Sequence, residues 1–558
     1  MCRRAHRRPS AVLRARRGAV HRRVVALHDR PPAGGAAGAL PRRAGVRSVT
    51  RPGGPAATAA PAPPASTATR TLARWTAGLR YGDVPARVRA VVTSQVLSYL
   101  AAVRASAGHP VGRALLTAYG PLAVGPGAAP DRAAHLMAAL SSSLYLEDTL
   151  YAGHVSHAAV GVPVAHQASQ GLTGRALLTA VTAADESAGR VTAAATLGPF
   201  RGQWASHTHL VAACAALLRG AGADAGTLVD AWGLALSAPP RALRPALLAS
   251  DAKVLSAAAP VRTAIDACAA ACAGLTGRDD LIEHPEGLLA VFSGVAVPEL
   301  LTHGLGTRWH SETLSFKLLP AGVHLDALIE CAADLHRSLR PAGAADVAAV
   351  DVAVPRMTAV MSRHAEQYVR GAASPLSALN LGAPYNVATA LLTGGLTVAD
   401  LAGPRLAEEG RWELAGRVRL HADDELSRAA IGSTAPVGET LRHAGARALD
   451  WRTELPGLPL EELVAELGPP ADSFEDAAKK LGCRMTVRMR DGREETRARA
   501  AGTGAVGSAS WRRHPALVRD KLLRTGAEPA AVAALERLET LSARELGEVL
   551  GRILHLTD

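Results

Sequence analysis

The chain has 558 residues, enough for two or three folded domains, and its 48% hydrophobic content is typical of a globular protein. Its net charge of +13 comes from residues 1–51, which hold fourteen Arg and one acid, so the remainder carries 48 basic and 48 acidic residues. The charge therefore gives no reason to expect nucleic-acid binding by the folded body. We find no uncharged apolar run of the roughly 18 residues that a membrane-spanning helix needs, and expect no membrane association.

Residues 1–66 form an Arg-, Ala- and Pro-rich leader that lacks the apolar segment of a secretory signal. Such a composition cannot bury a core, so we predict a disordered leader without a chemical role, with a targeting peptide or a misassigned start as alternatives. The six Cys are scattered without a CxxC pair. This usage favours a reduced, cytoplasmic protein.

Residues 67–315 are predicted to form a helical domain. In "YGDVPARVRAVVTSQVLSYLAAVRAS", Asp83 is a candidate helix cap and Pro85 lies in the first turn. Apolar residues then follow at helical spacing, as Val88, Val92 and Val96 do. Similar Ala-rich segments continue to about residue 300.

The hydrophobic period changes after residue 316, and residues 316–500 are predicted to form a smaller α+β lid domain. Apolar and polar residues alternate over 350–354, 418–420 and 483–489, which predicts strands, and Asp491-Gly492 provides a turn after the last. "YNVATALL" (385–392) is a predicted helix. Residues 501–558 are predicted to be helices that return to the helical domain.

Lysine is rare, with five residues beside 57 Arg. A chain that uses Arg so heavily tends to keep Lys where a compact ammonium group is needed. Lys253 in "SDAKVLSAAAP" and Lys317 in "LSFKLLP" lie in apolar neighbourhoods, where a partly desolvated ammonium binds a carboxylate strongly. A structural lysine with its stem on the core fits the same pattern.

Histidines cluster in two places. His154 and His157 are three residues apart and could share a metal ion, but no further ligand follows at a zinc spacing, so a proton-transfer role is the better hypothesis. His207 and His209 precede an Ala-rich helix, where free N–H groups favour an anion. At each place, a structural or solvent-facing histidine is the alternative interpretation.

Several ordered blocks together resemble the MmgE/PrpD family, from about Ala68 to the C-terminus. "EDTLYAGHVSHA" resembles the family's Asp-Asp-Thr block, and "SDAKVLSAAAPVRTAIDACAAACAGLTG" its lysine-containing helix. "LGTRWHSETLSFKLLP" resembles the entry into the lid, and "LGAPYNVATALLTG" a lid segment. The resemblance implies a mainly α fold, in which both ends of the chain form a large helical domain beside a smaller α+β lid, and a homodimer with the active site in the cleft between domains.

The resemblance also implies site residues. His157 takes the place of the catalytic histidine and Thr149 that of the block's threonine, while a second histidine is either His207 or His209. The remaining matches are Lys253, Lys317 and Asp148 as substrate-binding residues and Tyr385 as the lid tyrosine that closes over the site. The block departs from the family pattern at Glu147, at Ala158 and at Tyr145, which stands where an acid is usual.

The predicted function is that of a cofactor-independent lyase, a dehydratase or decarboxylase, acting by acid/base catalysis on a small di- or tricarboxylate such as 2-methylcitrate. No metal or other cofactor is expected. Three alternatives remain. The chain could be a divergent relative that binds an acidic metabolite or a protein partner without turnover, an epimerase at a carbon next to a carboxylate, or, least favoured, a zinc-dependent hydrolase.

Overall fold

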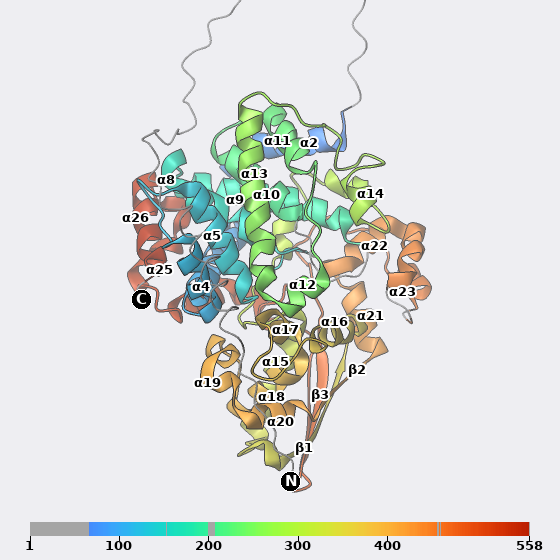
Figure 1. The fold of residues 1–558 in the computed structure, drawn as a ribbon. Coiled ribbons are helices and arrows are strands. Elements are labelled where there is room, and N and C mark those ends of the chain that lie inside the picture. The colour runs from blue at the N-terminus through green and yellow to red at the C-terminus, as the bar shows by residue number, and fades with distance from the viewer. Residues whose placement is uncertain (1–65, 152, 199–206, 455–456, 458, 557–558) are drawn as a thin grey trace, which may run out of the picture. The chain divides into compact units, whose positions relative to one another are not determined.

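The computed structural model describes residues 66–556, except 152, 199–206, 455–456 and 458. The predicted leader, apart from Ser66, lies outside the described residues. The described chain is mainly helical with one small sheet (Figure 1). Its first half contains the helices α2 (Ala68–Gly78), α3 (Ala86–Ala107), α4 (Pro110–Tyr119), α5 (Pro130–Ser143), α6 (Ser156–Ala159), α7 (Gly161–Ala165), α8 (Gln167–Gln170), α9 (Gly174–Ala195), α10 (His207–Gly220), α11 (Ala225–Ala235), α12 (Arg244–Ala249), α13 (Leu255–Cys272) and α14 (Leu288–Phe292).

The start of α3 differs from the sequence prediction. The helix begins at Ala86 directly after Pro85, whose fixed φ suits a helix entry. Asp83 instead ends a short 3-10 turn (Tyr81–Asp83), and its carboxylate accepts a hydrogen bond from the Arg80 N–H at 2.8 Å. A short polar side chain before a helix therefore caps a separate turn here.

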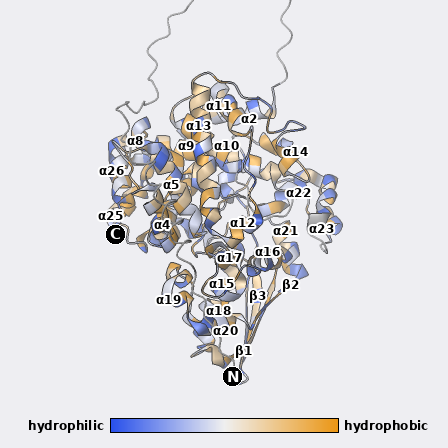
Figure 2. Cartoon of the chain, in the orientation of Figure 1, coloured by the Kyte–Doolittle hydropathy of each residue, from blue (hydrophilic) through white to orange (hydrophobic). Residues whose placement is uncertain are grey.

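The apolar helices of the first half are buried against one another. Helices α9, α10 and α13 pack together, and Figure 2 shows hydrophobic residues along α10 and α13. Among the described residues, one stretch, Asp251–Cys272, is long and apolar enough to cross a membrane by length and composition. Its contacts with α5, α10 and α11, and the burial of 56% of its most apolar window, are those of a core helix.

The second half contains the sheet, in which the three strands expected from the alternating pattern are present and a fourth is added. Its order is β2-β1-β3-β4, with β1 (Val347–Val354) parallel to β2 (Val418–Ala422) and antiparallel to β3 (Cys483–Met489). The added strand β4 (Glu494–Arg499) pairs with β3 after the Asp491-Gly492 turn. The alternation of apolar and polar residues did not predict β4, because this strand is rich in charged residues, as suits an exposed edge.

Helices cover the sheet and join it to the rest of the chain. Helix α15 packs on β3, β4 and α18. The helices of this half are α15 (Asp326–Leu339), α16 (Arg356–Glu366), α17 (Leu376–Leu381), α18 (Ala383–Thr393), α19 (Gly403–Leu406), α20 (Glu409–Ala415), α21 (Asp424–Gly432), α22 (Glu439–Ala444) and α23 (Leu460–Glu466). Apolar residues of 431–463, Trp451 among them, pack into the core of the first half.

The last helices of the chain return to its beginning. Helices α24 (His514–Leu523), α25 (Pro529–Leu535) and α26 (Ala543–Leu554) each contact α3. The largest core therefore combines side chains from both ends of the described chain. A second core lies between the sheet, α15 and α18. Leu144 and Leu146 belong to the second core, whereas Leu150 and Tyr151 belong to the first, so the segment between them lies at the junction of the two cores.

Candidate active site

Four of the five lysines of the chain are buried around residues 142–149, at this junction. They come from four separate places: the 3-10 turn before α13, the segment before α15, the segment before β3, and helix α24. These buried lysines are Lys253, Lys317, Lys479 and Lys521. The fifth, Lys480, is exposed. Since a buried ammonium group is costly without partners, their convergence marks this segment as the candidate site.

A short backbone pairing positions Lys317 opposite Glu147. Thr149 and Ser315 form an isolated antiparallel bridge, with N–H to O distances of 3.0 and 2.9 Å. In an antiparallel pair, residues two steps away in opposite directions also face each other. Glu147 therefore faces Lys317, whose Nζ lies 3.1 Å from Glu147 Oε1, and both side chains are fully buried.

Two histidines lie on the same carboxylate oxygen. His154 Nδ1 is 2.5 Å and His157 Nε2 is 3.6 Å from Glu147 Oε1. Burial by itself would raise the pKa of Glu147, but Lys317 and then His154 outweigh it and hold this pKa well below its usual range. Burial lowers the pKa of His154 to about 4 and that of His157 well below its ordinary value. At neutral pH the arrangement is a carboxylate between one ammonium and two neutral imidazoles.

Ser141 and Glu147 flank the two ring nitrogens of His157. Its Nδ1 lies 2.8 Å from Ser141 Oγ, which also lies 3.2 Å from the Ala138 carbonyl oxygen. The tautomer of the ring decides whether Nδ1 donates to the Ser141 hydroxyl or accepts from it. Nε2 faces Glu147 at 3.6 Å. A neutral imidazole held this way is a proton acceptor whose charged form the carboxylate would stabilise.

Lys253 has an unusual set of partners. Its Nζ donates to the Ser142 carbonyl and lies 3.7 Å from the ring centre of Tyr145, and its side chain is buried. Burial lowers its pKa to about 8. In the part of the chain that the structure describes, it forms no ion pair with a carboxylate. Lys317 Nζ lies 5.3 Å from the same Tyr145 ring. The Tyr145 ring thus lies against two ammonium groups, one of which has no carboxylate partner among the described residues.

The other two lysines support the next two residues of the segment. Lys521 Nζ donates to Ser98 Oγ and to the Leu146 carbonyl, both at 2.6 Å, and Ser98 donates to Asp148 Oδ1 at 2.6 Å. Burial raises the pKa of Asp148 to about 6 even though Lys521 opposes that shift.

Lys479 Nζ donates to Thr149 Oγ1 at 2.8 Å, and burial together with Lys317 lowers its pKa to about 7. Sequence reasoning did not place Lys479 and Lys521 in the site. The scarcity of lysine was the available signal, and it applied to them as much as to the two lysines that were chosen.

His207 and His209 lie in different surroundings. The ring of His209 lies 5.3 Å from that of His157, and burial lowers the pKa of His209 to about 3. His207 instead packs on Phe292, with ring centres 4.5 Å apart. The arrangement brings His209 to the cluster and His207 to a hydrophobic contact at the start of the same helix, α10.

Tyr385 does not join the cluster in this structure. Its hydroxyl donates to the Asp400 carbonyl at 2.6 Å, and its ring stacks on Trp412 at 4.5 Å between ring centres. The tyrosine is part of the second core, where α18 meets α20. The expected contact of the lid tyrosine with the site is therefore not made.

Glu147, His154 and His157 could in principle hold a metal ion, since one donor atom of each lies within 4.8 Å of the others. However, the Glu147 oxygen that faces both imidazoles already accepts from Lys317, and Lys253 adds a second buried positive charge nearby. A divalent cation would have to enter beside two ammonium groups. The donor set fits poorly with a metal and well with an anion.

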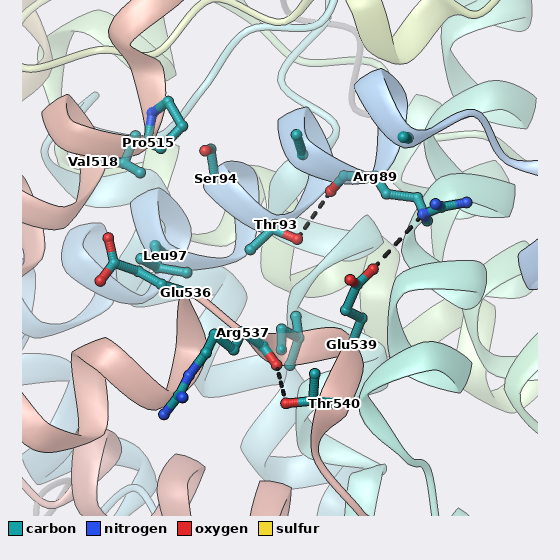
Figure 3. Close-up of a pocket in the computed structure, with 13 residues that line it drawn as sticks. Arg89, Thr93, Ser94, Leu97, Pro515, Val518, Glu536, Arg537, Glu539 and Thr540 are labelled. Carbon is teal, nitrogen blue, oxygen red and sulfur yellow. Dashed lines mark hydrogen bonds and ion pairs between the residues drawn. The ribbon is translucent and has the colours of Figure 1, made fainter.

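A separate hollow of about 420 Å³ lies elsewhere on the structure, between α3, α24 and the segment after α25 (Figure 3). Arg89 and Glu539 pair across it at 3.7 Å, and Arg537 and Glu536 also line it. None of the predicted site residues lines this hollow. Its balanced charges contrast with the positive character of the lysine cluster.

Comparison with known families assigns two long parts of the chain. Residues 70–301 match the MmgE/PrpD N-terminal domain, and residues 319–460 match the MmgE/PrpD C-terminal domain. The chain belongs to the MmgE/PrpD family. Membership supports a dehydratase-like function. No curated protein matches the chain. The 145–149 segment and Lys253 lie within the first matched range, whereas Lys479 and Lys521 lie beyond the second.

Proposed function

We propose that this protein is a lyase that removes water from a small hydroxy-di- or tricarboxylate without a bound cofactor. The observation that carries the proposal is the excess of buried positive charge at the 145–149 segment, with Lys253 lacking a carboxylate partner among the described residues. A substrate carboxylate would complete that charge. Preorganised cations also stabilise the enolate-like charge that develops when a proton next to a carboxylate is removed.

The proposed reaction assigns the proton to His157. In the tautomer that carries its proton on Nδ1, Nε2 removes the proton from the carbon next to the carboxylate, and the electron pair of that C–H bond forms the new C=C bond as the C–O bond breaks. The imidazolium, stabilised by Glu147 at 3.6 Å, returns the proton to the departing hydroxyl, so that water leaves. General acid/base catalysis of this kind contributes about 10²–10⁴-fold in rate.

The remaining residues would position the reacting groups. Lys253 would hold the substrate carboxylate, and Lys317 would hold Glu147 in its charged form. Lys479 and Lys521 would keep Thr149 and Asp148 oriented from behind. The site is nearly closed, with His154 the most exposed of the three clustered residues at 17% of its side chain. Closure of this kind excludes water and strengthens every charge interaction inside.

The test uses the full chain in D₂O with a panel of hydroxy acids that includes 2-methylcitrate and citrate, followed by NMR. Lyase activity gives an alkene product and is expected to disappear in Lys253→Met and to fall strongly in His157→Gln. Exchange of the α-proton without an alkene would instead support an epimerase. Binding seen by thermal shift with neither product nor exchange would support the divergent binder and refute the lyase.

A further inference from the structure

Tyr145 occupies a position that the proposed chemistry does not explain. Its side chain is 4% exposed, and its ring faces two ammonium groups, Lys253 at 3.7 Å and Lys317 at 5.3 Å. The ring of His154 meets it edge-on, with centres 6.3 Å apart. An aromatic face attracts cations through its quadrupole without neutralising them.

The backbone at Tyr145 is strained as well. Its φ of 53° lies in the left-handed region, which a bulky residue rarely adopts. Such strain persists only where the surroundings hold it, and it is concentrated at functional sites. Tyr145 also packs in a small hydrophobic cluster with Leu248 of α12, Ala365 of α16 and Leu381 of α17, which restrains the side chain.

We propose that Tyr145 is a positioning residue that holds the Lys253 ammonium in place while leaving its charge free for one carboxylate of the substrate. This rests on the proposed function for the identity of the ligand, a small carboxylate anion. A ring keeps Lys253 oriented and available.

The experiment measures the affinity of the full chain for citrate, succinate and propionate by calorimetry. Tyr145→Phe keeps the ring and is expected to bind within twofold of the wild type. Tyr145→Leu loses the cation–π contact and is expected to bind about five- to thirtyfold more weakly.

A double-mutant cycle separates this role from a purely structural one. In the Lys253→Met background, Tyr145→Leu is expected to have no further effect on citrate affinity. The thermal midpoint of each ligand-free variant reports folding independently. If Tyr145→Leu weakens binding equally with and without Lys253, the proposal is wrong.

These measurements need no turnover. A wild type that binds carboxylates but catalyses nothing would refute the proposed lyase and leave the Tyr145 test intact. If the lyase is active, Tyr145→Leu is expected to raise the KM about five- to thirtyfold and to lower the rate at saturating substrate by a smaller factor, because His157 and its Ser141 contact remain. A large fall in that rate with unchanged affinity would overturn the positioning role.

Discussion

Glu147 and Lys317 are a fully buried pair, 3.1 Å apart, that a single backbone bridge two residues away brings face to face. The same Glu147 oxygen is the point on which His154 and His157 converge. A buried ion pair contributes little net stability, and breaking it by removing one partner is costly. Its value here is the orientation of two imidazoles around a fixed negative charge.

Replacement of His157 by Gln is expected to lower turnover by about 10²–10⁴-fold while leaving citrate affinity within threefold, because the imidazole transfers the proton but does not hold the carboxylate. Ser141→Ala is the variant to compare with His157→Gln. It keeps the imidazole but removes the hydroxyl that lies 2.8 Å from Nδ1, so a fall of about tenfold is expected. Steady-state rates and calorimetry check both, and equal turnover in His157→Gln and the wild type would contradict the assignment.

Carboxylate binding is expected to weaken above about pH 8. Burial lowers the pKa of Lys253 to about 8, so its ammonium is present below that pH and is lost as the pH rises through it. Citrate is fully ionised in this range, and the dissociation constant should then rise about tenfold per pH unit. Calorimetry from pH 7 to 10 measures this, with Lys253→Met as the control that lacks the effect. Identical slopes in the two proteins would exclude Lys253 as the anchor.

Lys521→Met is expected to destabilise the fold by about 3–5 kcal/mol. The Ser98 hydroxyl still donates to the buried Asp148, but the ammonium that donates to Ser98 is lost. Lys480→Met provides a matched control with the same substitution at an exposed lysine, where a change within about 0.5 kcal/mol is expected. Urea denaturation followed by circular dichroism measures both. Equal midpoints for the two variants would show that Lys521 contributes nothing to the buried network.

Removal of metal ions is expected to leave the protein unchanged. Lys317 donates to the same Glu147 oxygen that faces both imidazoles. A divalent ion held by Glu147, His154 and His157 would therefore lie next to a positive charge. Dialysis against a chelator should change neither the thermal midpoint nor the activity. Elemental analysis should find no more than adventitious metal, less than about 0.1 ion per chain. A stoichiometric metal that is lost in His154→Ala would refute this expectation.

Gly504→Ala is expected to disturb the approach to Lys317. A Cβ at Gly504 would lie 1.8 Å from the Phe316 carbonyl oxygen, and the Gly504 carbonyl accepts from the Phe316 N–H at 2.8 Å. The neighbouring backbone would have to move, with a loss of about 1–3 kcal/mol and weaker citrate binding. Gly551→Ala, where a Cβ would meet nothing within 4 Å, is the control and should be neutral or slightly stabilising. Thermal melts and calorimetry compare the two.

The sequence was sufficient for the mainly helical fold and the three alternating strands, because those depend on local hydrophobic period. It was also sufficient to place Lys253, Lys317 and His157 in one site, through ordered blocks that resemble a family. Lys479 and Lys521 were beyond it, because the contacts that bury them join residues 330 and 375 positions apart. The choice between His207 and His209 likewise depended on which side of the first turn of α10 faces α6, which no spacing rule settles.

The contact of Lys521 with the Leu146 carbonyl spans 375 residues and has a consequence for how the protein is made. While the ribosome produces the first half of the chain, Asp148 and its neighbours lack the ammonium that will later enclose them, and they must stay hydrated or be shielded by a chaperone. The binding site is therefore among the last parts of the molecule to mature. A nascent chain halted before α24 would lack the ammonium that contacts Ser98 and the Leu146 carbonyl.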